Sequence, residues 1–434
     1  MAGFTTAVNV IYTMKKVTSY VLKVASRCNL NCSYCYMYNL GDKTYMNQPK
    51  FMSLETITAL AEKLEAYSVA SGIPYMQIIF HGGEPLLLGP DYYAQCLAIF
   101  KEKAPSVDFS FSIQTNGVSL GKEWYEWLQA NGVRVGISID GPERFHDAYR
   151  KFHNGRGSYH EVAEAVKLGA QNGLVGILSV LNIDIPVEEY YREMKTLEVK
   201  NLNLLFPDGH YDRLPHWFDK ERFGADDYTP FADWLIGLFD LWKKDKERPI
   251  IKLFENILEI LFGDEQVGNQ AFGLSTNGVA VIETDGGIEV ADSIRACYEN
   301  ITRNTINVHT HRVEDIFNNP LFEVYYHAHT LVAKKCLNCP VYDFCGGGFL
   351  GNRYAYHNGF DNPTIYCKDI IKLVTHIQND FINELPAETV ARLELEKVTY
   401  GEILETINRP DGETAQQDWA AQLLSFKQPD LICS

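Results

Sequence analysis

The sequence of 434 residues contains no apolar run that approaches the roughly 20 residues of a membrane-spanning helix, so we do not expect a membrane protein. Basic residues are also few: 39 Lys and Arg stand against 56 Asp and Glu, and the net charge is −17. A protein that binds phosphate backbones needs the opposite sign, so nucleic acid is not an expected partner. Residues 1–16 lack the charged start and the small-residue cleavage site of a signal peptide.

Cysteine is the residue type whose placement is most informative. Ten cysteines are present, and seven of them fall in two groups. In a chain without a secretion signal, clustered cysteines favour metal sites over disulfides. We therefore predict two metal centres in a protein of the reducing cytoplasm.

The first group has CxxxCxxC spacing and consists of Cys28, Cys32 and Cys35. A [4Fe-4S] cluster normally takes four Cys ligands, so three local ones would leave one iron open. An open iron can chelate a small molecule through adjacent amino and carboxylate groups. The alternatives are a zinc knuckle or three unrelated buried thiols, although zinc sites usually present paired CxxC spacings.

Residues 20–206 alternate between short β-branched or apolar runs and helical patterns. The predicted strands are 20–25, 76–80, 109–113, 133–139, 175–180 and 202–206, and the intervening helices are 54–67, 92–103, 122–130, 159–171 and 187–197. Six strands with helical crossovers imply parallel pairing. We predict an α/β fold with a partial (β/α)6 barrel of the TIM type, a doubly wound sheet being the alternative; either places chemistry at the carboxyl ends of the strands.

The cysteine loop and the segments after the next three strands resemble the radical S-adenosylmethionine (AdoMet) enzymes. Tyr36 follows the third cysteine, and His81-Gly-Gly-Glu-Pro85 follows the second strand. The resemblance implies a [4Fe-4S] cluster, cleavage of AdoMet to a 5′-deoxyadenosyl radical and hydrogen abstraction from a substrate. It also implies an AdoMet pocket formed by Tyr34, Tyr36, Gly82, Gly83, Glu84, Gln114, Asn116, Ser138, Asp140 and Arg150. A plain turn at Gly82-Gly83 and a surface salt bridge at Arg150 are the alternatives.

The second group consists of Cys336, Cys339, Cys345 and Cys367, and three glycines follow Cys345. Four cysteines can complete a [4Fe-4S] cluster or a zinc site, and the residues alone do not separate the two. The pattern resembles the SPASM extension of peptide-modifying radical AdoMet enzymes, which often holds two auxiliary clusters through seven cysteines. Here two of the expected positions hold Ala291 and Phe349, and no cysteine lies near Ser275. We therefore predict one auxiliary [4Fe-4S] cluster.

Asp292 directly follows the lost position Ala291. In sulfatase-maturing relatives the matching aspartate is a proposed general base, so the resemblance implies that Asp292 is catalytic. The alternative is a solvated residue just past the turn at residues 284–287. The test is Asp292→Asn, which should slow product formation more than 5′-deoxyadenosine formation.

The run from Cys345 through Arg353 to Tyr354 resembles maturases that build cyclophanes in ribosomally made peptides. We therefore predict a peptide maturase that forms an intramolecular carbon-carbon crosslink, with a precursor peptide and an external electron donor of the flavodoxin or ferredoxin type as partners. The alternatives are a formylglycine-generating sulfatase maturase, a thioether-forming enzyme and, more distantly, a non-catalytic iron-sulfur or zinc scaffold.

The predicted organisation has five parts. They are an N-terminal extension (1–16), the radical AdoMet barrel (17–225), a helical bridge (226–270), the SPASM-like domain (271–384) and a helical appendage (385–434).

Overall fold

The computed structural model describes residues 15–170, 173, 175–264, 267–409, 419–429 and 431. Its main element is a sheet in which nine strands are described, in the order β11-β10-β1-β2-β3-β4-β5-β6-β7. The strands are β1 (Ser19–Ala25), β2 (Tyr75–Gly82), β3 (Asp108–Thr115), β4 (Arg134–Ser138), β5 (Val175–Val180), β6 (Asn201–Leu205), β7 (Ile250–Ile251), β10 (Val279–Ile282) and β11 (Ile288–Glu289). All neighbours pair in parallel except β10 and β11. The predicted α/β fold is confirmed.

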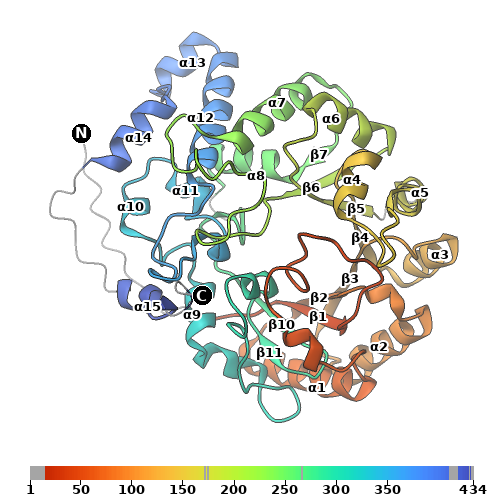
Figure 1. Cartoon of the computed structure of the whole chain (residues 1–434). Helices are drawn as coiled ribbons and strands as arrows, with labels where there is room; N and C mark the ends of the chain where they lie inside the picture. Colours follow the sequence, from red (N-terminus) through yellow and green to blue (C-terminus); the bar gives the residue numbers. More distant parts are fainter. Residues whose placement is uncertain are drawn as a thin grey trace.

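The helices that connect these strands lie on the outside of the curved sheet (Figure 1). They are α1 (Leu54–Ser71), α2 (Pro90–Lys103), α3 (Lys122–Asn131), α4 (Glu143–Tyr149), α5 (Tyr159–Ala170) and α6 (Val187–Thr196). Local sequence sets their ends: the Ser53 side chain accepts from the Thr56 amide at the start of α1, and Gly72, with φ +68°, ends it. Only α4 was not expected from the helical pattern, since its seven residues span just two turns.

The sheet extends beyond the six predicted strands because later segments return to it. β10 pairs with β1, with Ser19 opposite Val279, and β11 pairs with β10. β7 pairs with β6 at the other edge. These strands have two to four residues, too few for a periodic pattern in the sequence.

The C-terminal half consists mainly of short helices that pack against the open side of the sheet (Figure 1). The longer helices are α7 (Pro230–Lys244), α8 (Lys252–Leu261) and α12 (Cys367–Glu384), and the shorter ones are α9 (Pro320–Tyr326), α10 (Lys334–Leu337), α11 (Tyr342–Cys345), α13 (Ala387–Arg392), α14 (Tyr400–Asn408) and α15 (Ala420–Leu424). The 3₁₀ helices are η1 (Thr44–Asn47), η2 (Pro85–Leu87), η3 (Asp292–Ala296), η4 (Val313–Asn318) and η5 (Leu350–Arg353), and a small hairpin joins β8 (Gly268–Asn269) to β9 (Phe272–Gly273).

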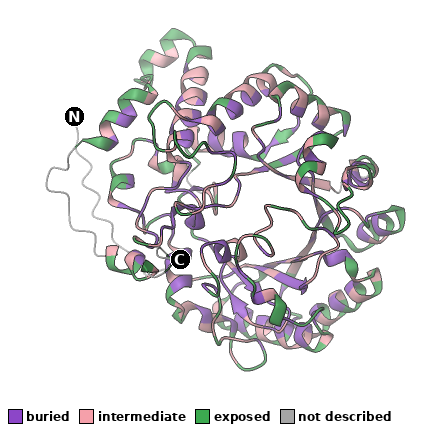
Figure 2. Ribbon diagram, in the orientation of Figure 1, coloured by how far each residue is buried: buried purple, intermediate pink, exposed green. Residues whose placement is uncertain are grey.

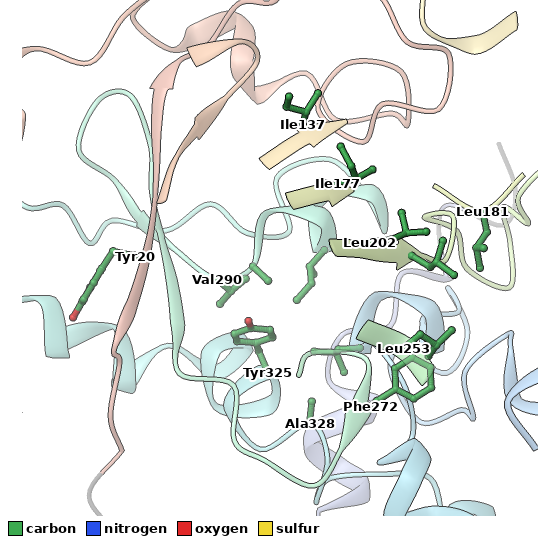
Figure 3. Close-up of a cluster of buried hydrophobic side chains, with 14 of the residues drawn as sticks. Tyr20, Ile137, Ile177, Leu181, Leu202, Leu253, Phe272, Val290, Tyr325 and Ala328 are labelled. Carbon is green, nitrogen blue, oxygen red and sulfur yellow. The ribbon is translucent and has the colours of Figure 1, made fainter. Parts of the chain in front are cut away.

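One apolar core runs from the sheet into this C-terminal half. Figure 3 shows Ile137, Ile177 and Leu202 on three neighbouring strands, with Val290 and Tyr325 nearby. The buried segments in Figure 2 likewise run through both halves. The segments after β6 are therefore held against the barrel by shared apolar burial. Within the described residues, no helix combines the length and hydropathy needed to cross a bilayer.

Candidate active site

The first cysteine group lies in the loop after β1, at the carboxyl end of the parallel strands. The Cys35 amide donates to the Cys32 carbonyl at 3.0 Å, which folds the loop into a turn. All three thiols are half-buried, and burial raises their pKa values, that of Cys35 to about 11. Iron would stabilise the thiolates instead, so three thiols on one turn are a donor set that fits a cluster.

The glycines of the predicted AdoMet motif bring β2 against the start of the cysteine loop. A Cβ on Gly82, with φ +129°, would lie 2.2 Å from the Ala25 carbonyl oxygen, and a Cβ on Gly83 would lie 2.3 Å from that of Arg27. The Gly83 amide donates to Ala25 at 2.7 Å. The two glycines are thus required by close approach of backbone to backbone.

Glu84 is fully buried, and its carboxylate accepts three hydrogen bonds from neighbouring protein groups. Its carboxylate accepts from the Thr115 hydroxyl at 2.7 Å, the Asn116 amide at 2.8 Å and the Leu86 amide at 2.8 Å. Three donors satisfy a buried carboxylate, so Glu84 fixes the end of β3 relative to β2.

The other predicted pocket residues meet at the ends of β3 and β4. The Asn116 side chain donates to Asn29 in the cysteine loop at 2.7 Å, and Gln114 donates to Ser138 at 3.1 Å. Arg150 donates to the Tyr34 hydroxyl at 2.8 Å, and Tyr34 in turn bonds to Asp140. Because Arg150 is 7% exposed and lies 3.8 Å from Asp140, it belongs to a buried network and not to a surface salt bridge.

The predicted base Asp292 lies at the same barrel end, in an ion pair with Lys23 of β1. Tyr36 donates to Asp292 at 2.6 Å across 256 sequence positions, and Lys23 donates to Tyr36 at 3.1 Å. Burial raises the pKa of Asp292, but Lys23, His81 and Arg295 outweigh it and hold that pKa below its usual range. Asp292 is therefore a well-compensated carboxylate inside the site, and its role as a base stays a prediction.

Arg295 anchors the segment that carries Asp292. It is 1% exposed, donates to Glu283 at 2.5 Å and to Glu289 at 3.3 Å, and lies 3.6 Å from Asp42. Charged groups that are this buried are stable only when paired, so the network fixes η3 relative to β11 and to the loop after the cysteines.

Lys23 and Asp208 are site residues that the sequence analysis missed. Lys23 stands in an alternating strand, where its burial is not evident, and Asp208 follows β6 in a loop without a motif. Burial and the neighbouring Asp292 raise the pKa of Asp208 to about 7, and Arg213 only partly opposes them. The signal that could have drawn attention to both is their place near the ends of parallel strands.

The second cysteine group lines a cavity in the C-terminal half. Cys336 is on α10, Cys345 ends α11 and Cys367 begins α12, with Cys339 between the first two helices. Apolar residues complete the lining, among them Val341, Ile371 and Ile407. Four thiols around one cavity are a donor set that fits an auxiliary cluster.

Arg353 organises the glycines beside this cavity. It is fully buried and donates to the carbonyls of residues 346, 347, 348, 328 and 331 at 2.6–3.1 Å. Gly346, Gly347 and Gly348 all have positive φ, between 53° and 78°. The glycines thus permit a tight turn whose carbonyls converge on one guanidinium.

Among the described residues, no three His, Cys, Asp or Glu side chains lie close enough to share a single metal ion. A zinc ion holds its thiolates at about 2.3 Å, whereas a cluster places several irons between them and so spreads them farther apart. The thiols of both groups are ligands that either centre can use, so metal analysis has to separate a cluster from a zinc ion.

Comparison with known proteins identifies the barrel. Residues 22–198 match the model of the Radical SAM superfamily. This segment is a radical SAM domain. The domain carries the CxxxCxxC loop, and the assignment confirms the predicted AdoMet and [4Fe-4S] chemistry. The chain therefore contains a radical SAM domain, which spans residues 22–198.

The similarity to known proteins extends beyond the radical SAM domain. A cysteine-type anaerobic sulfatase-maturating enzyme of Clostridium novyi is 26% identical over 82% of this chain and 93% of its own length, and a serine-type enzyme of Bacteroides thetaiotaomicron is 28% identical over 63% and 68%. The solved structure of AdoMet-bound anSMEcpe has a TM-score of 0.71 at 21% identity, over 84% of this chain and 98% of its own. SuiB of Streptococcus suis, bound to its precursor peptide SuiA, has a TM-score of 0.51 at 15% identity, over 78% and 73%.

These relatives favour the sulfatase-maturase alternative over the cyclophane hypothesis. The structure neighbours, all below 25% identity, support the fold alone, including its C-terminal domain. The five domain boundaries stay predictions, and residues 1–14 of the N-terminal extension lie outside the described part of the chain.

The positions predicted to have lost an auxiliary cluster are filled by packing. Ala291 is 3% exposed, and Phe349 is half-buried against the core. The neighbouring Cys297 is buried, and its thiol lies 3.8 Å from the Gly351 carbonyl oxygen. The second cysteine group beyond the radical SAM domain therefore consists of the four predicted residues.

Proposed function

We propose that the protein oxidises a side chain of a peptide or protein by radical AdoMet chemistry. The observation that carries the proposal is the meeting of a three-cysteine loop and a deep group of charged residues, Lys23, Asp292 and Asp208, at one end of the barrel. Curated relatives that share most of this chain's length act in sulfatase maturation by name, and anSMEcpe has been solved with the Cp18Cys peptide. Both support a peptidyl substrate.

The first candidate is oxidation of a Cys or Ser side chain to formylglycine on a sulfatase. The bound cluster and AdoMet would supply a 5′-deoxyadenosyl radical that takes a hydrogen atom from the β-carbon of that side chain. The site then has to accept one proton and pass one electron onward. We assign the proton to a carboxylate at the barrel end and the electron to the second cysteine group.

The residues of the radical SAM domain would divide the remaining work. Cys28, Cys32 and Cys35 would hold the cluster, and the ends of β2 to β4 would form the AdoMet pocket. The Arg150–Tyr34–Asp140 network stiffens the wall of that pocket, and Lys23 keeps Asp292 charged and oriented. Deep burial excludes bulk water, which protects a radical from side reactions.

The second candidate is the cyclophane crosslink, in which the carbon radical attacks a nearby aromatic ring. Packing of Ala291 and Phe349 where relatives with seven cysteines hold a further cluster favours it. Both candidates use the same hydrogen abstraction, proton acceptor and electron acceptor. They differ in the group with which the oxidised carbon then reacts. The sequence of the substrate decides which group is near that carbon.

The partners follow from this chemistry. A peptide or protein substrate enters the barrel end, and an external flavodoxin- or ferredoxin-type protein in the cytoplasm delivers the reducing electron. Cys336, Cys339, Cys345 and Cys367 would hold an auxiliary cluster, which would supply an acceptor for the electron that leaves the substrate.

The test is turnover by the anaerobically reconstituted protein with AdoMet, dithionite and the Cp18Cys peptide. Release of 5′-deoxyadenosine together with an aldehyde that reacts with a hydrazide reagent supports formylglycine formation. A product that has lost two hydrogens, keeps its sulfur and resists fragmentation between two residues supports the crosslink.

The control is Cys96→Ala, which removes a buried thiol of α2 outside both cysteine groups and should leave turnover intact. Absence of AdoMet cleavage under all conditions would favour the scaffold alternative and contradict the proposal.

A further inference from the structure

A basic hairpin lies against the first cysteine loop. It consists of residues 150–157, between α4 and α5, with the sequence Arg150-Lys-Phe-His-Asn-Gly-Arg-Gly157. Four of these residues are Arg, Lys or His and none is Asp or Glu, whereas the whole chain has a net charge of −17. The basic hairpin is thus a locally positive segment of an acidic protein.

Hydrogen bonds join the basic hairpin to the cysteine loop. The Asn31 amide donates to the Lys151 carbonyl at 2.7 Å. His153 donates from Nε2 to the carbonyl of Cys28 at 3.0 Å. The hairpin therefore contacts the peptide units of the loop at Cys28 itself and directly before Cys32.

The basic hairpin has a fixed shape of its own. The Phe152 amide donates to the Arg156 carbonyl at 2.8 Å, and Gly155, with φ +85°, lies in the turn. The Arg156 guanidinium lies 4.2 Å from the centroid of the Phe152 ring and forms an ion pair with Glu161 at 2.5 Å. A surface that is ordered before a partner arrives loses less conformational entropy on binding.

Lys151 carries the charge that is most available to a partner. Its side chain is exposed, and within the described part of the chain it forms no ion pair, whereas Arg156 already has an acidic partner. Asn31 and Ser33, on either side of Cys32, are also exposed. The outer edge of the cysteine loop thus reaches the surface beside Lys151, and a protein that binds this lysine would lie next to that edge.

We propose that the basic hairpin is the docking surface for the external electron donor, an acidic one-electron carrier protein. This inference rests on the proposed function, which requires such a donor. One electron leaves the reduced donor and enters the cluster that Cys28, Cys32 and Cys35 would hold, and no atom is transferred. Because the chain as a whole repels a negative partner, a positive segment beside the cysteine loop orients the encounter.

The first experiment compares two reductants in the anaerobically reconstituted protein. Release of 5′-deoxyadenosine is measured at low salt with dithionite, a small molecule that needs no docking surface, and with reduced flavodoxin, the acidic protein probe. In Lys151→Glu the rate at limiting flavodoxin should fall about tenfold, because attraction between opposite charges speeds association by about 10-fold to 10³-fold. The rate with dithionite should remain that of the wild type.

Salt and a milder variant separate lost attraction from damage to the loop. The range of charge interactions falls from about 10 Å at 0.1 M salt to about 3 Å at 1 M, so added salt should reduce the difference between Lys151→Glu and the wild type. Lys151→Gln, which removes the charge without reversing it, should lose less activity with flavodoxin than Lys151→Glu. The bond from Asn31 reaches the Lys151 backbone, so both variants keep it.

The matched control is Lys397→Glu. Lys397 is exposed between α13 and α14, and its replacement changes the net charge by the same amount. Its rates with both reductants should remain those of the wild type. An equal loss with flavodoxin in Lys397→Glu and Lys151→Glu would assign the effect to net charge and overturn the inference.

A second measurement does not depend on turnover. A carbodiimide joins a lysine amine to a carboxylate in contact with it, with loss of one water. Mass spectrometry of the digested complex should therefore find Lys151 joined to an acidic peptide of flavodoxin. Crosslinks confined to other lysines, such as Lys335 beside the second cysteine group, would overturn the inference.

The two reductants also distinguish failure of this inference from failure of the proposed function. An unchanged rate with flavodoxin in Lys151→Glu, or a wild type that takes electrons only from dithionite, overturns the inference while the proposed function stands. Equal losses with both reductants overturn it as well, because Lys151 would then support the cysteine loop and not the partner. Absence of AdoMet cleavage with dithionite in the wild type counts against the proposed function itself.

Discussion

The two cysteine groups of this chain differ in how their ligands are supplied. Cys28, Cys32 and Cys35 come from one loop of the radical SAM domain, where polar and charged side chains surround them. Cys336, Cys339, Cys345 and Cys367 come from separate short elements and line a cavity with apolar walls. Three thiols would leave one iron of a [4Fe-4S] cluster without a protein ligand, whereas four thiols would supply a ligand for every iron.

The comparison shows that both sites offer thiol ligands and that the side chains around the thiols differ. Polar side chains can bind a charged molecule such as AdoMet and can donate or accept protons. Apolar side chains exclude water, which favours a cluster that transfers electrons without reacting with a substrate. Substitutions at four places test this contrast, and the first has the largest expected effect.

Replacing one cysteine of the first group should abolish the reaction. Cys32→Ala leaves two thiols in the loop, too few to hold an open cluster, so 5′-deoxyadenosine release should fall to background. Product analysis with AdoMet and dithionite measures this. Retained AdoMet cleavage would show that the first group is not the reactive one.

Replacing two cysteines of the second group should separate the two sites. In Cys336→Ala/Cys345→Ala, iron after anaerobic reconstitution should fall from about eight to about four per chain. AdoMet cleavage should persist, because the first loop is intact, while peptide oxidation is lost. About four irons in both proteins, with zinc bound, would make the second site structural and the contrast wrong.

Replacing Arg353, the buried cation beside the second group, should weaken iron binding by that group selectively. Arg353→Met leaves several buried carbonyls without a donor, and we expect unfolding stability to fall by about 3 kcal/mol. Iron should be lost from the second group first, since the glycine turn that follows Cys345 loses its anchor.

Denaturant unfolding and iron analysis check the Arg353 prediction. Arg312→Met is the comparison, because Arg312 is exposed and its contacts with Glu314 lie at the surface. Equal stability of the two variants would contradict a supporting role for Arg353.

Opening the apolar wall should have the smallest effect. Ile407 of α14 is 8% exposed and lines the cavity of the second group, so Ile407→Lys should admit water and chelator. Iron release from the second group to a chelator should speed up several-fold, whereas the first group should be unaffected. Glu405→Lys, exposed on the same helix, should release iron at the wild-type rate; equal rates in both variants would mean that α14 does not seal the site.

The first region was largely predictable from sequence. The strands and helices of the barrel agree with the expected segments to within a few residues, because apolar alternation and helix caps are local signals. The pocket residues Gln114, Asn116, Ser138 and Asp140 were expected together because the resemblance to radical AdoMet enzymes implies one pocket, which agrees with the rule that parallel strands end on one side. The two glycines also allow β2 to approach the cysteine loop closely, and their part in the AdoMet pocket stays a prediction.

For the second region, the sequence predicted the four cysteine ligands but not the residues that form the cavity around them. The spacing from Cys336 to Cys367 indicated a metal site, but the cavity wall includes Ile407, forty positions beyond Cys367. The appendage that carries Ile407 had no assigned purpose in the sequence. Its contact with the cavity follows from packing of α14 against α10 and α12.

The sequence by itself determined the α/β alternation, the two cysteine groups and the strand ends that carry the pocket, because ligand spacing and apolar periodicity are set by neighbouring residues. Only the tertiary structure decided which charges meet. Lys23 and Asp292 pair because β10 returns beside β1 and β11, which precedes Asp292, pairs with β10. A charge's partner, and with it the charge's pKa, depends on burial and on distances through space, which separation along the chain does not encode.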